Sequence, residues 1–179
     1  KIQSCQLHIM DKKEEFGKPN HYIHIALAPP KSHDRAEWFV EKAVEIGIQE
    51  ISFVITRYSE RDNIKLNRIK SRAISSMKQS LQAYLPQIND VLSIEDFVET
   101  CSNSEKYVGY LQDENTNFLF TSATPDDNYC VLIGPEGDFM PEEVELALNC
   151  DFKTISLGQS RLRTETAGIV ACHILNIIN

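Results

Sequence analysis

The sequence has no long hydrophobic run, no paired cysteines and no cluster of metal-binding side chains. No apolar stretch approaches the roughly 20 residues that a membrane-spanning helix needs, so a membrane protein is not expected. The five cysteines are scattered, with no Cys-x-x-Cys pair, and the five histidines are equally dispersed. This pattern argues against disulfide-rich and zinc-binding proteins, and it predicts reduced thiols in a cytoplasmic protein without a metal.

The composition is that of an ordinary globular protein. The chain has 179 residues, of which 42% are hydrophobic and 25% charged, enough for one domain with a substantial core and a remnant of a second. The formal net charge is −8, and an acidic balance by itself disfavours a nucleic-acid partner. The sequence begins at Lys1 in a segment that reads as the middle of a domain, so we expect it to belong to a longer protein.

Hydrophobic periodicity predicts strands that alternate with helices from residue 31 onward. The expected helices are 32–46, 65–82, 94–100, 141–148 and 164–178, and the expected strands are 51–56, 107–111, 130–133 and 152–157. Two earlier strands, 4–10 and 21–28, flank a polar turn and belong either to the main sheet or to the tail of a truncated domain. The alternation is typical of an α/β fold with a mostly parallel sheet flanked by helices.

A first glycine-bearing loop, 133–140, lies between a predicted strand and the helix that Pro141 opens. Gly134 and Gly137 let a ligand approach the backbone closely, and ligands bind beyond the carboxyl ends of parallel strands, where helix N-termini offer free N–H groups. A tight turn without a ligand is the alternative. The loop matches neither the dinucleotide nor the nucleoside-triphosphate glycine pattern.

A second loop, 155–167, breaks at Gly158 and then carries a polar cluster of Arg161, Arg163, Thr164, Glu165 and Thr166. The alternative is a capping cluster with Thr164 as the N-cap, although no Glu or Gln follows three residues later as a complete capping box requires. Because one short helix separates the strands that precede the two loops, we expect the loops to lie side by side at one sheet edge and form a ligand site.

Together, the run Ile-Gly-Pro-Glu-Gly-Asp-Phe at 133–139 and the run Leu-Gly-x-x-x-Leu-Arg-Thr-Glu-Thr-Ala at 157–167 strongly resemble motifs of one family. It is the SPOUT-class family of 16S ribosomal RNA uridine-N3 methyltransferases. Further matches extend the resemblance over residues 29–178: Lys31, Arg35, Glu37, Lys42, 45–47, 57–61, Gln79, Ser80 and Pro86. The chain departs from the family pattern at Asp138, Gln159 and Gln82, where glycine, proline and arginine are usual; the first two concern loop detail and the third an RNA contact.

The resemblance implies both a fold and a set of partners. Residues 29–179 are expected to form an α/β domain closed by a C-terminal deep trefoil knot, an exception to the un-knotted topology of most proteins. Residues 1–28 are expected to be the remnant of an N-terminal β-barrel resembling a PUA domain. The expected cofactor is S-adenosylmethionine, and the expected partners are the 16S RNA of the small ribosomal subunit and a second copy of the chain.

Carried over by position, the resemblance places the cofactor against Leu111, Ile133, Gly134, Glu136, Gly137, Leu157, Gly158, Leu162, Arg163 and Thr166. Leu157 and Leu162 are expected to sandwich the adenine, with plain core leucines as the alternative. Arg163 is expected to stabilise the anionic uracil edge or clamp a phosphate. Glu165 is expected to act as a base or to orient Arg163, with a helix-dipole acid as the alternative.

A basic segment, 57–78, answers the objection from net charge. It carries seven Lys or Arg against two acids, a net +5 within a chain of −8. We expect RNA to bind Arg57, Arg61, Lys65, Arg68 and Arg72; a solvated helix face is the alternative. Two other functions remain open: a knotted RNA-binding or ribosome-assembly module without catalysis, and a SPOUT methyltransferase acting on transfer RNA.

Overall fold

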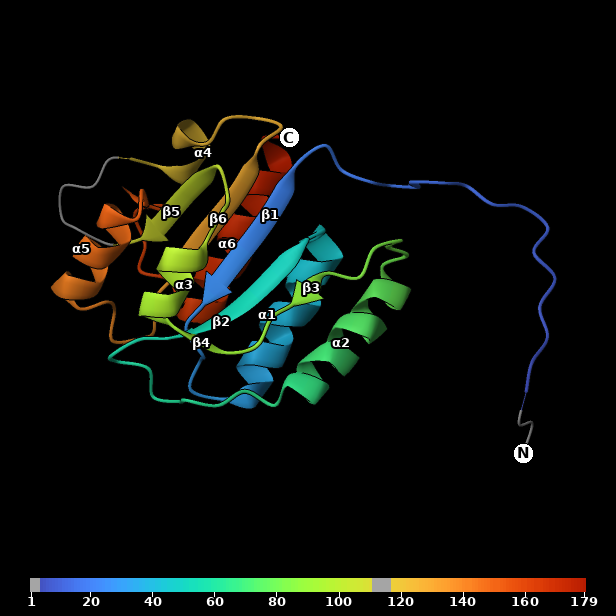
Figure 1. The fold of residues 1–179 in the computed structure, drawn as a ribbon, viewed down its shortest axis with the longest axis horizontal. Helices are drawn as coiled ribbons and strands as arrows, with labels where there is room; N and C mark the ends of the chain where they lie inside the picture. Colours follow the sequence, from blue (N-terminus) through green and yellow to red (C-terminus); the bar gives the residue numbers. More distant parts are fainter. Residues whose placement is uncertain (1–3, 111–116) are drawn as a thin grey trace.

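The computed structural model describes residues 4–110 and 117–179 and shows one twisted sheet with helices on both faces (Figure 1). The strands are β1 (Tyr22–Leu27), β2 (Glu50–Ile55), β3 (Gln87–Ile88), β4 (Leu92–Ser93), β5 (Glu105–Gly109), β6 (Asn128–Ile133) and β7 (Lys153–Ile155). They run in the order β3-β2-β1-β6-β5-β7, with β4 also paired to β2, and all these pairs are parallel. The predicted parallel α/β architecture is confirmed.

The helices agree with the predicted ones to within a few residues, apart from the short α4, which was not predicted. They are α1 (His33–Ile46), α2 (Leu66–Gln79), α3 (Ile94–Thr100), α4 (Leu119–Ser122), α5 (Pro141–Asn149) and α6 (Thr164–Ile177). Ser32 caps α1 by accepting a hydrogen bond from the backbone N–H of Arg35 at 3.3 Å, and Gly47 ends α1 with a φ of 110°. These are the signals that define helix ends from sequence.

The core is divided between the two faces of the sheet. Along β1, Ile23, Ile25 and Leu27 point to the face covered by α1 and α6, whereas Ala26 packs into a second cluster on the face covered by α3 and α5. Because both faces are buried, strands read as continuous apolar runs rather than as an alternating pattern. Over the described residues, no helix is long and apolar enough to cross a membrane.

The N-terminal part of the chain differs from the prediction. Residues 4–10 form no strand, and the segment before β1 extends away from the sheet (Figure 1). The predicted strand 21–28 instead lies in the middle of the sheet, since β1 pairs with both β2 and β6. The α/β unit therefore starts at β1 rather than at residue 29. Local periodicity does not reveal this placement, because β6 lies about a hundred residues further along the chain.

A close contact between α6 and α1 fixes the start of α6. A Cβ atom placed on Gly168 would lie 2.7 Å from Cε2 of Phe39 and 3.1 Å from Cδ1 of Leu27. Phe39 and Leu27 are fully buried, so glycine is what allows α6 to approach the first helix and strand this closely. The end of the second glycine-bearing loop is thereby held over the carboxyl edge of the sheet.

Candidate functional site

A cavity of about 360 Å³ opens at the carboxyl ends of β5, β6 and β7. Both predicted glycine-bearing loops line it, because β6 and β7 both pair with β5 and their loops approach from either side of that strand. The prediction that the two loops share one site is confirmed, although β5 lies between their strands. The size suits a small organic ligand or cofactor.

The first loop is shaped by a close packing contact and a turn. A Cβ on Gly134 would lie 2.8 Å from Cε2 of Phe139, so this position accepts only glycine without displacing the ring. Asp138 has a φ of 65°. Its N–H donates to the carbonyl of Pro135 at 3.0 Å, and its carboxylate accepts from the N–H of Phe139 at 2.9 Å. Aspartate tolerates this left-handed conformation, which explains how it replaces the glycine usual at this position.

The second loop is tied to the first by Thr164. The buried Thr164 hydroxyl donates to the carbonyl of Gly134 at 3.0 Å. Thr164 is therefore not the helix cap: Arg163 occupies the N-cap position of α6 and makes no side-chain capping bond. Within the loop, the Ser156 hydroxyl donates to the carbonyl of Gly158 at 2.9 Å and accepts from its N–H at 3.2 Å, while Gly158 adopts a φ of 141°. The two loops form one connected wall.

Most of the predicted cofactor residues lie in this wall. The cavity is lined by Ile133, Gly134, Glu136, Leu157, Gly158, Leu162 and Arg163. Two of the predicted residues, Thr166 and Gly137, are not among the lining residues, and a Cβ on Gly137 would lie 3.0 Å from Cβ of Tyr58. Leu111 lies outside the described residues. The sequence interpretation missed Gly109 and Tyr110, which line the cavity because β5 ends between the two loops.

Arg35 connects the two predicted carboxylates. Its Nε lies 3.6 Å from Oε1 of Glu165, and its Nη1 lies 3.6 Å from Oε1 of Glu136, which also accepts from the N–H of Lys31 at 3.3 Å. The Oε2 atoms of both glutamates are buried and have no hydrogen-bond partner among the described residues. Glu165 is thus paired with Arg35; the sequence interpretation had it act as a base or orient Arg163, and it did not foresee this pairing.

The basic segment is partly neutralised by α1. Arg68 lies 2.6 Å and Arg72 3.3 Å from the buried carboxylate of Glu37, and Arg72 also contacts Glu41 at 3.3 Å. Arg61 donates from Nε to the backbone carbonyl of Lys31. Of the predicted RNA-binding residues, Arg57 and Lys65 are exposed and make no side-chain ion pair with the described part of the chain.

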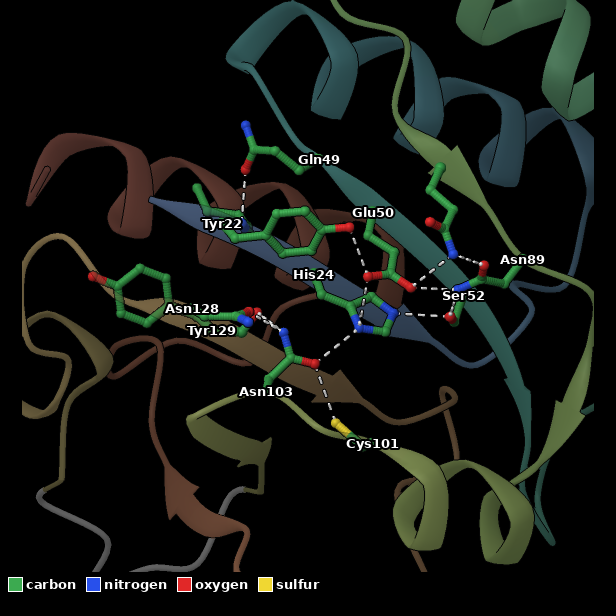
Figure 2. A network of polar contacts seen from close by, with 12 residues as sticks. Tyr22, His24, Gln49, Glu50, Ser52, Asn89, Cys101, Asn103, Asn128 and Tyr129 are labelled. Atoms are coloured by element: carbon green, nitrogen blue, oxygen red, sulfur yellow. Dashed lines mark hydrogen bonds and ion pairs between the residues drawn. The ribbon is translucent and has the colours of Figure 1, made fainter. Parts of the chain in front are cut away.

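A second polar cluster lies inside the protein on the face of the sheet that α3 covers (Figure 2). Nε2 of His24 lies 2.8 Å from Oγ of Ser52, and its Nδ1 lies 3.6 Å from Oε2 of Glu50 and 3.4 Å from Oδ1 of Asn103. The order of residues is that of a nucleophilic triad. However, Ser52 is 1% exposed, and both ring nitrogens of His24 already have partners inside the protein, so we assign the cluster a structural role.

The structural cluster predicts a pH-dependent stability. Burial lowers the pKa of His24 below its ordinary 6.5, so the folded state holds the imidazole neutral while the unfolded chain takes up a proton. Stability is therefore complete above about pH 6.5 and falls toward lower pH by up to roughly 1.4 kcal/mol per pH unit. We expect His24→Gln to be less stable at neutral pH and to lose less on acidification, as measured by urea unfolding between pH 7.5 and 5.

The matched control is His173→Gln, because His173 lies exposed on α6. This variant is expected to follow the wild-type pH dependence. Parallel losses of stability in the wild type and His24→Gln would show that acid unfolding does not depend on His24.

The fold and the cavity define an α/β protein that binds a ligand at the carboxyl ends of parallel strands, between two glycine-bearing loops. Residues 18–176 match the sequence model of the RNA methyltransferase domain, and the chain belongs to this family. No group of three or more potential metal ligands occurs in the part of the chain that the structure describes.

The chain is similar in sequence to ribosomal RNA small subunit methyltransferases. The chain is 31% identical over 174 residues to ribosomal RNA small subunit methyltransferase E of Mesomycoplasma hyopneumoniae, covering 93% of this chain and 74% of that protein. For the protein of the same name from Rickettsia conorii the identity is 29% over 163 residues, covering 89% and 66%. The chain thus spans about two thirds to three quarters of these relatives.

The fold is also similar to solved structures of methyltransferases. A probable rRNA-methyltransferase from Porphyromonas gingivalis is similar with a TM-score of 0.80 at 42% identity, covering 88% of this chain and 68% of that one. A methyltransferase from Legionella pneumophila, solved with bound SAM, has a TM-score of 0.82 at 26% identity, covering 88% and 66%.

Proposed function

We propose that this chain is the catalytic domain of an S-adenosylmethionine-dependent methyltransferase that modifies N3 of a uridine in 16S RNA of the small ribosomal subunit. The observation that carries the proposal is the single cavity formed by the two motif-bearing loops. The names of the relatives support a small-subunit RNA substrate. The S-adenosylmethionine found in the Legionella and Neisseria gonorrhoeae structures supports the cofactor.

The lining of the cavity fits such a cofactor. Ile133, Leu157 and Leu162 offer apolar surface for an adenine ring, and the backbone of Gly158, where a Cβ would meet nothing within 4 Å, is open to close approach. Glu136 adds a buried carboxylate oxygen without a partner among the described residues, an acceptor for a ligand hydroxyl or amine. When bound, the cofactor supplies the electrophilic methyl group.

The chain's own residues supply alignment and charge. Arg163 lies exposed at the cavity, where its guanidinium can donate to an anionic uracil edge, and such preorganised donors stabilise developing charge. Arg161 lines the same cavity from the same loop, and Arg57 follows β2 at the same edge of the sheet. These cations on the strand-end loops are suited to RNA phosphates. RNA binding therefore depends on these arginines around the cavity and not on the net charge of the chain.

The proposal also includes a C-terminal trefoil knot, a homodimer and a barrel remnant. The C-terminal trefoil knot is supported by the family resemblance and by the crossing of the chain from α5 on one face of the sheet to α6 on the other.

A homodimer is supported by Trp38 of α1 and Ile177 of α6, which are 45% and 67% exposed on helices that pack together. Exposed Leu7 and Ile9 support a barrel remnant before β1, and a ribosomal RNA substrate supports a cytoplasmic enzyme.

The proposal is tested by methyl transfer from labelled S-adenosylmethionine with the full-length protein. The substrates are small ribosomal subunits lacking this modification and, separately, total transfer RNA. We expect label in 16S RNA alone, and N3-methyluridine in its nuclease digest. Label in transfer RNA alone would favour the other methyltransferase reading. Stabilisation by S-adenosylhomocysteine without transfer to either RNA would favour the non-catalytic binding module.

A charge comparison tests the RNA surface. Replacing Arg68 and Arg72 by glutamine is expected to cost roughly 1 kcal/mol of stability, because both half-exposed arginines pair with buried Glu37. Replacing Arg57 and Lys65 by glutamine is expected to leave stability unchanged and to lower the salt dependence of RNA binding by about one phosphate contact each. Denaturant unfolding and RNA binding at several salt concentrations measure the two effects. The reverse outcome, with the salt dependence changed only by the Arg68 and Arg72 replacements, would place the RNA on α2.

A further inference from the structure

The carboxylate of Glu165 is buried without the hydrogen bonds that buried carboxylates need. Its residue is 5% exposed, its Oε2 has no partner among the described residues, and its Oε1 is 3.6 Å from Nε of Arg35, too far for a normal hydrogen bond. A buried carboxylate oxygen without a hydrogen bond destabilises the folded protein. An acid that served only the α6 dipole would be expected at the surface, where water completes its hydrogen bonds. The position is therefore suited to a ligand donor.

Three separate elements meet at the guanidinium of Arg35, the partner of this carboxylate. Arg35 is held at the start of α1, where its own N–H bonds to the capping Ser32. Its guanidinium extends between Glu136, in the loop after β6, and Glu165, in the first turn of α6. Glu136 also has a buried Oε2 without a partner among the described residues. One guanidinium thus faces two carboxylates, which leaves an excess of acceptors.

The cluster borders the cofactor cavity but is not part of it. Glu136 lines the cavity, whereas Arg35 and Glu165 do not. Glu136 therefore connects the cavity to Arg35, and Arg35 in turn contacts Glu165. A guanidinium next to a free carboxylate oxygen presents donors beside an acceptor. Uracil has the complementary edge, an N3–H flanked by two carbonyls, while cytosine has a bare N3 acceptor that would face the carboxylate with repulsion.

We propose that Arg35, Glu136 and Glu165 recognise the imide edge of the target base, and this inference rests on the proposed function. Glu165 accepts the N3–H, Arg35 donates to a neighbouring carbonyl, and Glu136 keeps Arg35 in place. The proton passes from N3 to Oε2 of Glu165, and the electron pair of the N–H bond stays on N3, which becomes the nucleophile. Arg35 is thereby a specificity-determining residue and Glu165 the proton acceptor.

The test compares the full-length wild type with Glu165→Gln, Arg35→Lys and Arg35→Gln. Glu45→Gln is the control, because Glu45 lies on the same helix and pairs only with Lys42 among the described residues. Calorimetry measures the affinity for S-adenosylhomocysteine, and single-turnover methyl transfer to small ribosomal subunits is followed from pH 6 to 9. We expect affinities within about threefold of the wild type, a rate loss of about 100-fold or more in Glu165→Gln and Arg35→Gln, and a smaller loss in Arg35→Lys.

The pH profile separates a proton acceptor from a structural role. The wild-type rate is expected to be flat across this range, whereas the rate of Glu165→Gln rises about tenfold per pH unit because spontaneous ionisation of N3 replaces the base. A wild-type rate and profile in Glu165→Gln would overturn the inference, as would loss of cofactor affinity in proportion to the rate. If Arg35→Gln fails to fold, Arg35→Lys and Glu165→Gln still decide. A wild type that binds S-adenosylhomocysteine but transfers no methyl group overturns the proposed function itself.

Discussion

Arg163→Ala in the full-length protein is expected to lower the rate of methyl transfer by about 100-fold or more, as removal of one preorganised donor does at other sites of developing charge. Arg163 lies at the N-cap of α6 with an exposed side chain that lines the cavity and makes no capping bond. Its guanidinium is thus available to the anionic edge of the base, and its loss leaves that charge without a donor. Single-turnover transfer to small ribosomal subunits measures the effect.

The matched control is Arg161→Ala. Arg161 is similarly exposed, lines the same cavity and lies two residues away in the same loop. Arg161→Ala measures how much a positive charge in this loop contributes to RNA binding. We expect this variant to bind RNA more weakly and to recover the wild-type rate of methyl transfer at higher RNA concentration. Arg163→Lys retains the charge without the planar fork and is expected to recover only part of the rate. Equal effects of both alanine substitutions, or transfer by Arg163→Ala at the wild-type rate, would contradict the assigned role.

The elements of the fold were largely predictable because their signals are local. Ser32 and Gly47 mark the two ends of α1, and Pro141 opens α5, so the predicted boundaries fall within a residue or two. What local signals do not contain is the pairing of distant strands. The segment 21–28 was recognised as a strand. Its position in the middle of the sheet, however, depends on pairing with β6, which lies about a hundred residues further along the chain.

The same distinction explains the candidate site. The glycines and polar residues of both loops were predictable because tight turns require particular residues. Arg35 was noted only as part of a motif, since nothing in the sequence shows that its side chain reaches two glutamates more than a hundred residues away. The ion pairs of the basic segment were not predictable for the same reason. Its charges were counted correctly, but Glu37 and Glu41 on the neighbouring helix face Arg68 and Arg72 in the fold.

Gly134→Val is expected to abolish cofactor binding, raising the dissociation constant for S-adenosylhomocysteine by on the order of 100-fold. The first added carbon alone would lie 2.8 Å from the ring of Phe139. Phe139 is 4% exposed and packed in the core under the loop, so the ring cannot give way cheaply. The valine must then displace the loop that forms one wall of the cavity. This displacement also disturbs the bond from Thr164 to the Gly134 carbonyl, which joins the two loops. Calorimetric titration with S-adenosylhomocysteine measures the loss.

Gly158→Ala provides the comparison within the same cavity. Gly158 has a left-handed φ of 141°, but a Cβ there meets nothing within 4 Å. The substitution therefore adds backbone strain of about 1–3 kcal/mol without a clash that would displace the loop. We expect lower thermal stability and a dissociation constant within about tenfold of the wild type, so that the two glycines separate loop displacement from backbone strain. Tight cofactor binding by a folded Gly134→Val would mean that the cofactor lies outside this cavity, and the residue assignments of both loops would fall with it.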